Sequence, residues 1–255
     1  MTNHDWSFSI SALRSRLGLE CLLVINDFTA LAWALPTLPR EYLRQVGPGV
    51  AVAGTPIAVT GPGTGLGVSG LIPAGPGDAW VPLSGEGGHV TLAAETRLEF
   101  EVLSVLSARH GHASAERVLS GQGLVEIHDV LRRLRASPEP KAIGDAAAIV
   151  GAAIGAGDAQ AIEALDMFCG FLGSFAGNLA LTLGARGGVY IGGGIVPRLG
   201  RWFDASSFRR HFQSKGRFSG YLSDIPTLVI DAPTSPALQG AALALDARAA
   251  AREMN

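Results

Sequence analysis

The sequence predicts an α/β fold, in which short apolar strands alternate with longer helices. Apolar runs of strand length occur at residues 57–60, 188–191 and 227–230. Between the first two of these runs, apolar residues recur at helical spacing along much of the chain. Because strands that alternate with helices favour parallel pairing, we expect a largely parallel sheet flanked by helices.

The helical stretches can be placed from the spacing of their apolar residues. Helices are expected over residues 98–106, 115–134, 143–154, 161–183 and 237–252. A further apolar run at 22–25 predicts a strand that ends in Asn26 and Asp27, and residues 28–35 continue as a helix-compatible stretch. A second extended segment is expected over residues 68–72.

The charge and size of the chain limit its partners. The 255 residues include 20 basic and 22 acidic side chains, which gives a net charge of -2 with no block of like charge. This balance provides no electrostatic footprint for nucleic acid or for anionic lipid. A small neutral substrate or a nucleotide fits the composition better.

The cysteines and the longest apolar segment indicate a cytoplasmic protein with no membrane span. Cys21 and Cys169 are the only cysteines, which excludes a disulfide framework and suits a reducing compartment; both are expected in the core. Residues 167–185 carry no charge, but Ser174, Asn178 and Thr182 form one polar stripe at helical spacing. We therefore expect a buried helix there, with glycines on another side that allow close packing.

A glycine series provides the first candidate site. Gly61, Gly63, Gly65 and Gly67 alternate with other residues, and Thr64 adds a hydroxyl donor. Glycines allow a backbone with positive φ that turns several N–H groups toward one anion, which suits a phosphate group. The alternative is a glycine-rich hairpin turn that binds nothing.

Commoner nucleotide motifs do not explain this series. A Walker A loop needs Gly-Lys, and the only lysines, Lys141 and Lys215, follow proline and serine. Gly65, Gly67 and Gly70 spell a dinucleotide fingerprint, but such a fingerprint must open a helix, whereas residues 68–72 are predicted to be extended. An NAD-dependent oxidoreductase would therefore need a helix after Gly70.

Two acidic segments are candidates for substrate binding. Asp27 stands at a predicted strand end, where it could accept a proton from a substrate hydroxyl, although an Asp there could also cap the following helix. Glu86 and His89 lie in a glycine-rich turn, and Glu116 lies further along the chain; their side chains can hydrogen-bond hydroxyl groups. The spacing fits no zinc pattern, so we expect no metal ligands among them.

These segments together resemble the bacterial glucokinases, the non-zinc branch of the hexokinase, Hsp70 and actin superfamily. The resemblance is carried, in family order, by residues 25–30, 61–67, 85–90, 114–121 and 187–197. It implies a two-lobed actin-like (ribonuclease H-like) ATPase fold and ATP-dependent phosphorylation of the glucose 6-hydroxyl. The partners would be glucose and ATP, with Mg²⁺ as cofactor, and the resemblance also implies a homodimer.

The resemblance implies a role for each candidate residue. Asp27 would be the catalytic base, and Asn26, Glu86, His89 and Glu116 would hold the other hydroxyls of the sugar. Gly61, Gly63, Thr64, Gly65 and Gly67 would bind phosphate, and Gly192, Gly193 and Gly194 would lie near the adenosine.

One feature of the family is missing from the sequence. The family opens with an Asp-x-Gly-x-Thr phosphate loop, and no such motif occurs in these residues. We therefore expect a small lobe that is incomplete at its N-terminus, formed by residues 1–37 and 232–255, with a large lobe over 38–231. The sequence leaves two functions open, a glucokinase and a catalytically degenerate protein that binds sugar without transferring phosphate.

Overall fold

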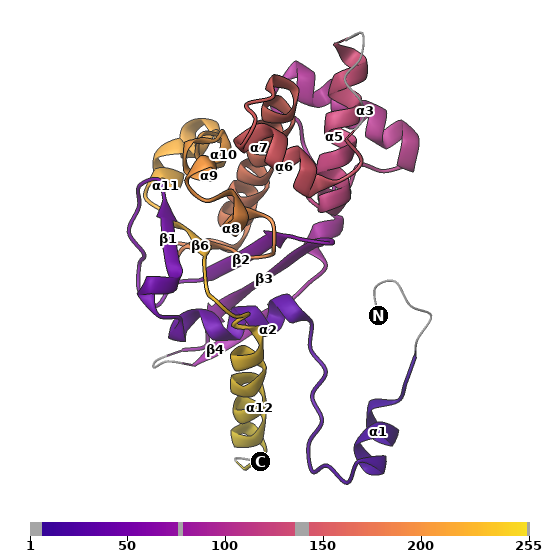
Figure 1. Cartoon of the computed structure of the whole chain (residues 1–255). Helices are drawn as coiled ribbons and strands as arrows, with labels where there is room; N and C mark the ends of the chain where they lie inside the picture. The colour runs from indigo at the N-terminus through magenta and orange to yellow at the C-terminus, as the bar shows by residue number, and fades with distance from the viewer. Residues whose placement is uncertain (1–6, 76–78, 136–142, 254–255) are drawn as a thin grey trace.

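A computed structural model describes residues 7–75, 79–135 and 143–253 of the chain (Figure 1). Its centre is a 6-stranded sheet with the strand order β1-β6-β5-β2-β3-β4. The strands are β1 (Leu43–Val46), β2 (Ile57–Pro62), β3 (Leu66–Pro73), β4 (Trp80–Ser84), β5 (Val189–Ile191) and β6 (Thr227–Ile230). The α/β class expected from the sequence is confirmed.

The sheet is mixed and not largely parallel as expected. Only the β2–β5 and β5–β6 pairs run parallel, whereas β1–β6, β2–β3 and β3–β4 are antiparallel. Strands β2, β3 and β4 follow one another as a meander, and short connections between neighbouring strands force antiparallel pairing. The parallel strand β5 is reached from this meander only through a long helical crossover, which the sequence pattern correctly indicated.

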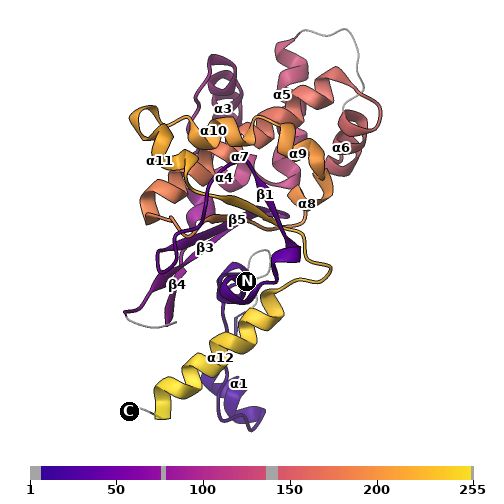
Figure 2. The same ribbon diagram turned by 90° about the vertical axis from the view of Figure 1, so that its left-hand side faces the viewer.

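Helices cover both faces of the sheet (Figures 1 and 2). The upper layer in Figure 1 contains α3 (Arg97–His110), α4 (Ala115–Val118), α5 (Gly121–Leu134), α6 (Ala146–Ile154), α7 (Ala159–Leu183), α8 (Val196–Leu199), α9 (Arg201–Ala205), α10 (Phe208–Gln213) and α11 (Ser219–Ser223). Below the sheet lie α2 (Asp27–Ala34) and α12 (Ala237–Glu253), and α1 (Ile10–Arg16) lies apart from the sheet. The helices expected from the apolar spacing are thus confirmed, with one of them divided into α4 and α5.

The expected strand at residues 22–25 is wrong. This segment is an irregular chain between α1 and α2, and Val24 in it is 52% exposed. No strand among the described residues lies beside it to complete its hydrogen bonds, so an apolar run alone does not make a strand here. Cys21 next to it is only half-buried, so its expected place in the core is also wrong, whereas Cys169 is buried.

Helix α12 packs against α2, which itself lies against β2, β3 and β4. The two segments assigned to a small lobe are therefore in contact across this face of the sheet. Gly240 makes the contact possible, because a Cβ atom there would lie 1.7 Å from the carbonyl oxygen of Ala30. The division at residues 37 and 232 stays a prediction.

The long helix α7 is the core of the upper layer. It is long and apolar enough to span a membrane by length and composition, but 72% of its most apolar window is buried inside the fold. Its glycines allow α10 to approach: a Cβ atom at Gly173 would lie 2.0 Å from the carbonyl oxygen of Phe208, and one at Gly177 would lie 2.4 Å from that of Phe212. The buried helix with close glycine packing expected from the sequence is confirmed.

Arg209 on α10 connects the upper layer to the edge of the sheet. Its guanidinium group is buried without a carboxylate partner and donates to the carbonyl oxygens of Pro48, Leu222, Ser223 and Ile225. Burial lowers the pKa of Arg209 to about 10, because the charged form loses its hydration. These bonds tie α10 to the end of α11 and to the loops beside β1 and β6.

We expect Gly173→Ala to lower the free energy of unfolding by about 1 to 3 kcal/mol, because the added methyl group would overlap the α10 backbone. Gly151→Ala is the matched control: Gly151 is exposed on α6, an added Cβ meets no atom within 4 Å, and alanine favours the helix by about 0.5 to 1 kcal/mol. Urea denaturation of both variants measures the difference. Equal stability of Gly173→Ala and the unsubstituted chain would contradict the packing of α7 on α10.

Candidate functional site

A pocket of about 440 Å³ lies at the end of the β2–β3 hairpin; we call it the central pocket. It is bounded by segments far apart in the sequence: the start of α2, the hairpin turn, the loop after β4, helix α4 and the loop after β5. Its lining includes all the polar candidates and most of the glycine candidates from the sequence, namely Asn26, Asp27, Gly61, Gly63, Thr64, Gly65, Gly67, Glu86, His89, Glu116, Gly193 and Gly194. Gly192 lies beside it and lines a neighbouring pocket.

The start of α2 presents Asn26 and Asp27 to the central pocket. Asn26, and not Asp27, caps the helix: its Oδ1 atom accepts hydrogen bonds from the backbone N–H groups of Phe28 (2.8 Å) and Thr29 (3.3 Å). This leaves the Asn26 amide nitrogen available to donate to a ligand. Asp27 is exposed in the first helical turn, and only its Oδ1 atom is engaged, by the N–H group of Phe28 at 2.9 Å. Its second oxygen is therefore available to accept a proton.

Glu86, His89 and Glu116 form a chain of polar side chains along one wall. His89 Nε2 lies 4.0 Å from Glu86 Oε2, and His89 Nδ1 lies 4.0 Å from Glu116 Oε1. The Glu86 side chain is 82% exposed and the Glu116 side chain 32% exposed. Spacings of this size leave each group free to bond a ligand hydroxyl, so the wall suits a polyhydroxylated molecule.

Glu116 also holds the hairpin turn in place. Its Oε2 atom accepts a hydrogen bond from the backbone N–H group of Leu66 at 3.1 Å, directly after the turn. The turn receives a second bond, because the N–H group of Gly121 at the start of α5 donates to the carbonyl oxygen of Gly63 at 3.0 Å. Glu116 therefore supports the turn with one carboxylate oxygen, and its Oε1 atom is the one that lies toward His89.

The glycine series forms a hairpin, in which Gly61 of β2 pairs with Gly67 of β3. None of Gly61, Gly63, Gly65 and Gly67 has a positive φ, so the expected reason for these glycines is wrong. Gly61, Gly65 and Gly67 are needed for close approach instead. A Cβ atom at Gly61 would lie 2.3 Å from the Gly192 backbone, and one at Gly65 would lie 2.3 Å from Glu116 Oε2.

The closest of these approaches joins the hairpin to α2. A Cβ atom at Gly67 would lie 1.8 Å from the ring of Phe28, the residue that follows Asp27. Phe28 lines the central pocket, yet sequence reasoning gave it no role. Its position directly after the Asn-Asp pair was the available signal, but only the structure shows that its ring lies over Gly67.

The loop after β5 closes the pocket on the other side of the hairpin. Gly192 N–H donates to the carbonyl oxygen of Thr60 at 2.8 Å, which continues the β2–β5 ladder past its end. Gly193 has a φ of +79°, and a Cβ atom there would lie 2.3 Å from the carbonyl oxygen of Pro62. This position therefore requires glycine for its backbone conformation as well as for space.

The strand geometry also excludes a dinucleotide fingerprint at this site. β3 runs from Leu66 through Pro73, so an extended strand, and no helix, follows Gly65 and Gly67. Among the described residues no group of three or more His, Cys, Asp or Glu side chains could hold a metal ion.

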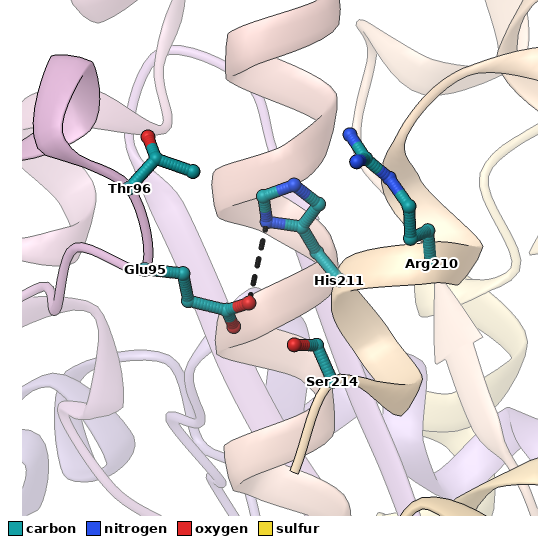
Figure 3. Close-up of a pocket in the computed structure, with 5 residues that line it drawn as sticks. All are labelled: Glu95, Thr96, Arg210, His211 and Ser214. Carbon is teal, nitrogen blue, oxygen red and sulfur yellow. Dashed lines mark ion pairs between the residues drawn. The ribbon is translucent and has the colours of Figure 1, made fainter. Parts of the chain in front are cut away.

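A separate hollow of about 460 Å³ lies between the start of α3 and α10 and shares no lining residue with the central pocket. Figure 3 shows that His211 of α10 points toward Glu95, with His211 Nδ1 3.8 Å from Glu95 Oε2. Lys215 Nζ donates to the other Glu95 oxygen at 2.9 Å and to Ser174 Oγ at 2.8 Å. These contacts join the upper-layer helices, and the hollow contains none of the candidate residues.

Comparisons with known proteins give one consistent family. A glucokinase family model matches residues 1–248. The glucokinase of Aromatoleum aromaticum is 60% identical over 246 residues, which are 96% of this chain and 73% of that protein.

Two solved structures share the fold. The crystal structure of a glucokinase from an Antarctic psychrotroph has a TM-score of 0.84 at 36% identity and covers 94% of this chain and 73% of its own. A ROK family glucokinase from Streptomyces griseus, in complex with glucose and AMPPNP, has a TM-score of 0.60 at 21% identity, with coverage of 94% and 73%.

We expect Gly67→Ala to weaken the site through Phe28, because the new methyl group would displace the aromatic ring and with it the start of α2. The free energy of unfolding should fall by about 1 to 3 kcal/mol, and hexose binding should weaken. Adding Phe28→Leu should recover part of the stability, since a smaller side chain makes room for the methyl group. Denaturation and calorimetry measure both quantities.

Gly220→Ala is the control, because an added Cβ at Gly220 on α11 meets no atom within 4 Å. If Gly67→Ala and Gly220→Ala behave alike in both assays, the contact between the hairpin and α2 does not shape the site.

Proposed function

The chain belongs to the glucokinase family, and on this premise we propose that it transfers the γ-phosphate of ATP to the 6-hydroxyl of glucose. The family consists of sugar kinases, so the class of reaction is a phosphotransfer. The actin-like ATPase fold expected from the sequence is confirmed by the structural likeness to glucokinases.

The observation that carries the proposal is the convergence of Asn26, Asp27, Glu86, His89 and Glu116 on one pocket with the glycine hairpin. A hexose offers several hydroxyl groups on one rigid ring, and such a ligand needs donors and acceptors on more than one side. The central pocket provides carboxylates, an imidazole and an amide from separate segments. Its volume of about 440 Å³ accommodates a sugar.

Asp27 is proposed as the base that removes the proton of the attacking hydroxyl. Asp27 lines the pocket together with the hairpin turn that would bind the γ-phosphate, and its Oδ2 atom makes no hydrogen bond within the described residues. Phosphoryl transfer depends mainly on positioning and on stabilising charge, so the base must lie between sugar and phosphate. The position of Asp27, which lines both the central pocket and a second pocket that adjoins it, supports this role.

The hairpin turn is proposed to bind the phosphates. The backbone N–H groups of Thr64 and Gly65, and the Thr64 hydroxyl, have no partner among the described residues. Free N–H groups in a tight turn suit an anion. Gly192, Gly193 and Gly194 are proposed to lie along the nucleotide.

Mg²⁺ is proposed to arrive with ATP, because a magnesium ion commonly binds through substrate phosphates and few carboxylates. It would neutralise phosphate charge. A cytoplasmic homodimer is proposed from the family resemblance alone.

A second candidate function is sugar binding without phosphotransfer. The 255 residues contain no Asp-x-Gly-x-Thr motif, which the family resemblance links to phosphate binding. Glucose calorimetry and an assay of glucose 6-phosphate formation with Mg²⁺-ATP separate the two functions. Glucose binding with transfer supports the kinase, and glucose binding without any transfer supports the second candidate.

Asp27→Asn should separate binding from chemistry. The amide keeps the size of the side chain and most of its hydrogen bonding but cannot take up the proton. We therefore expect glucose affinity to change little while turnover falls by roughly 10² to 10⁴. Asp246→Asn, an exposed change on α12 away from the pocket lining, is the matched control and should leave both unchanged. Undiminished turnover in Asp27→Asn would remove Asp27 from the role of base.

A further inference from the structure

The central pocket offers polar side chains for a sugar and backbone N–H groups for a phosphate, but it has no cationic side chain of Lys or Arg, among the described residues, to balance the charge of a polyphosphate. Its charged lining residues are the acids Asp27, Glu86 and Glu116, and no lysine or arginine of the described chain lines it. ATP carries several negative charges on its phosphates, and enzymes that transfer phosphoryl groups stabilise them with cations. If ATP binds here, its phosphates need a positive partner from outside the central pocket.

The adjoining pocket, of about 620 Å³, provides such a partner. It shares Asp27, Phe28, Gly193 and Gly194 with the central pocket, so the two cavities meet at the proposed base. Among the described residues that line it, Arg198 is the one cationic side chain and Asp27 the one acidic side chain.

Arg198 is also free to bind a ligand. It is exposed on α8, and its guanidinium group makes no hydrogen bond or ion pair within the described part of the chain. Many other arginines do have partners: Arg44 pairs with Asp204 and Arg135 with Glu163, while Arg209 binds backbone carbonyls. An unpaired arginine at the wall of a cavity carries a permanent positive charge, and its planar set of N–H donors matches phosphate oxygens.

The backbone next to Arg198 presents further donors on the same wall. The N–H groups of Gly193 and Gly194 have no partner among the described residues, although both glycines line both pockets. Their neighbours hold the loop in place, since Ile195 N–H donates to the carbonyl oxygen of Pro62 and Arg198 N–H to that of Ile195. Residues 193–198 therefore combine two free backbone N–H groups with an unpaired guanidinium group. The hydrogen bond from Ile195 to Pro62 holds this segment against the hairpin.

We propose that Arg198 binds the phosphates of the nucleotide in the adjoining pocket and supplies the positive charge that the central pocket lacks. This inference rests on the proposed function and assigns it a residue outside the sugar site. Arg198 is a phosphate-binding residue in this proposal, and Asp27 remains the base. Glu86 and Glu116 line only the central pocket and Arg198 only the adjoining one, whereas Asp27 lines both.

Arg198→Gln tests the proposal in the 255-residue chain, because it removes the charge and keeps a polar, shorter side chain. Loss of a charge-assisted contact to phosphate should weaken ATP binding by about 10-fold to 100-fold. Adenosine and glucose have no phosphate, so their affinities should change less than about twofold. Calorimetry with ATP, adenosine and glucose as separate ligands measures all three.

Arg201→Gln is the matched control. Arg201 is exposed at the start of α9, three positions further along the chain, and lines neither pocket, so the same change of charge there should leave ATP binding unaltered. Equal weakening of ATP by both variants would show a general effect of net charge and overturn the assignment.

The outcomes also separate this inference from the proposed function. If ATP binds the unsubstituted chain and Arg198→Gln with equal affinity, the role of Arg198 fails while the kinase proposal stands. If the unsubstituted chain binds glucose but not ATP, the nucleotide part of the proposed function fails, and the assignment of Arg198 fails with it.

Discussion

The candidate site depends on the close approach of the β2–β3 hairpin to the elements around it. Gly61 lies against the Gly192 backbone, Gly65 against Glu116 and Gly67 against the ring of Phe28. A side chain at any of these positions would overlap its neighbour, since the Cβ distances range from 1.8 to 2.3 Å. The hairpin thereby fixes three separate segments with respect to one another, and each of them contributes polar groups to the central pocket or to its border.

This constraint explains how a chain with a modest share of charged residues, 16%, can gather several of them at one place. The acids are not stabilised there by ion pairs with lysine or arginine, because no such residue of the described chain lines the central pocket. Backbone N–H groups orient two of them instead: Phe28 N–H donates to Asp27 and Leu66 N–H donates to Glu116. Exposure to solvent, highest for Glu86, limits the cost of bringing like charges together.

The residues of the candidate site could be predicted from the sequence, but most of the contacts that join them could not. Helical spacing placed α2, α3, α7 and α12 correctly. The family resemblance grouped Asn26, Asp27, Glu86, His89 and Glu116, and all five line the central pocket. Strands β1 and β4 were missed, because both are only partly buried and neither is a continuous apolar run. The apolar run at 22–25 was wrongly predicted as a strand, because it has no neighbouring strand among the described residues. The role of the hairpin glycines was not predicted, since their close approach to segments distant in sequence leaves no local pattern, whereas helical spacing did predict close packing at the glycines of α7.

The central claim is that these segments form one hexose site with Asp27 at its reactive end. A crystal structure of the 255-residue chain soaked with glucose tests it most directly. The account predicts one glucose in the central pocket, with its 6-hydroxyl oxygen roughly 2.6 to 3.2 Å from an Asp27 carboxylate oxygen and its other hydroxyls on Asn26, Glu86, His89 and Glu116. Glucose bound in another hollow, such as the one beside His211, or bound with the 6-hydroxyl turned away from Asp27, would contradict the account.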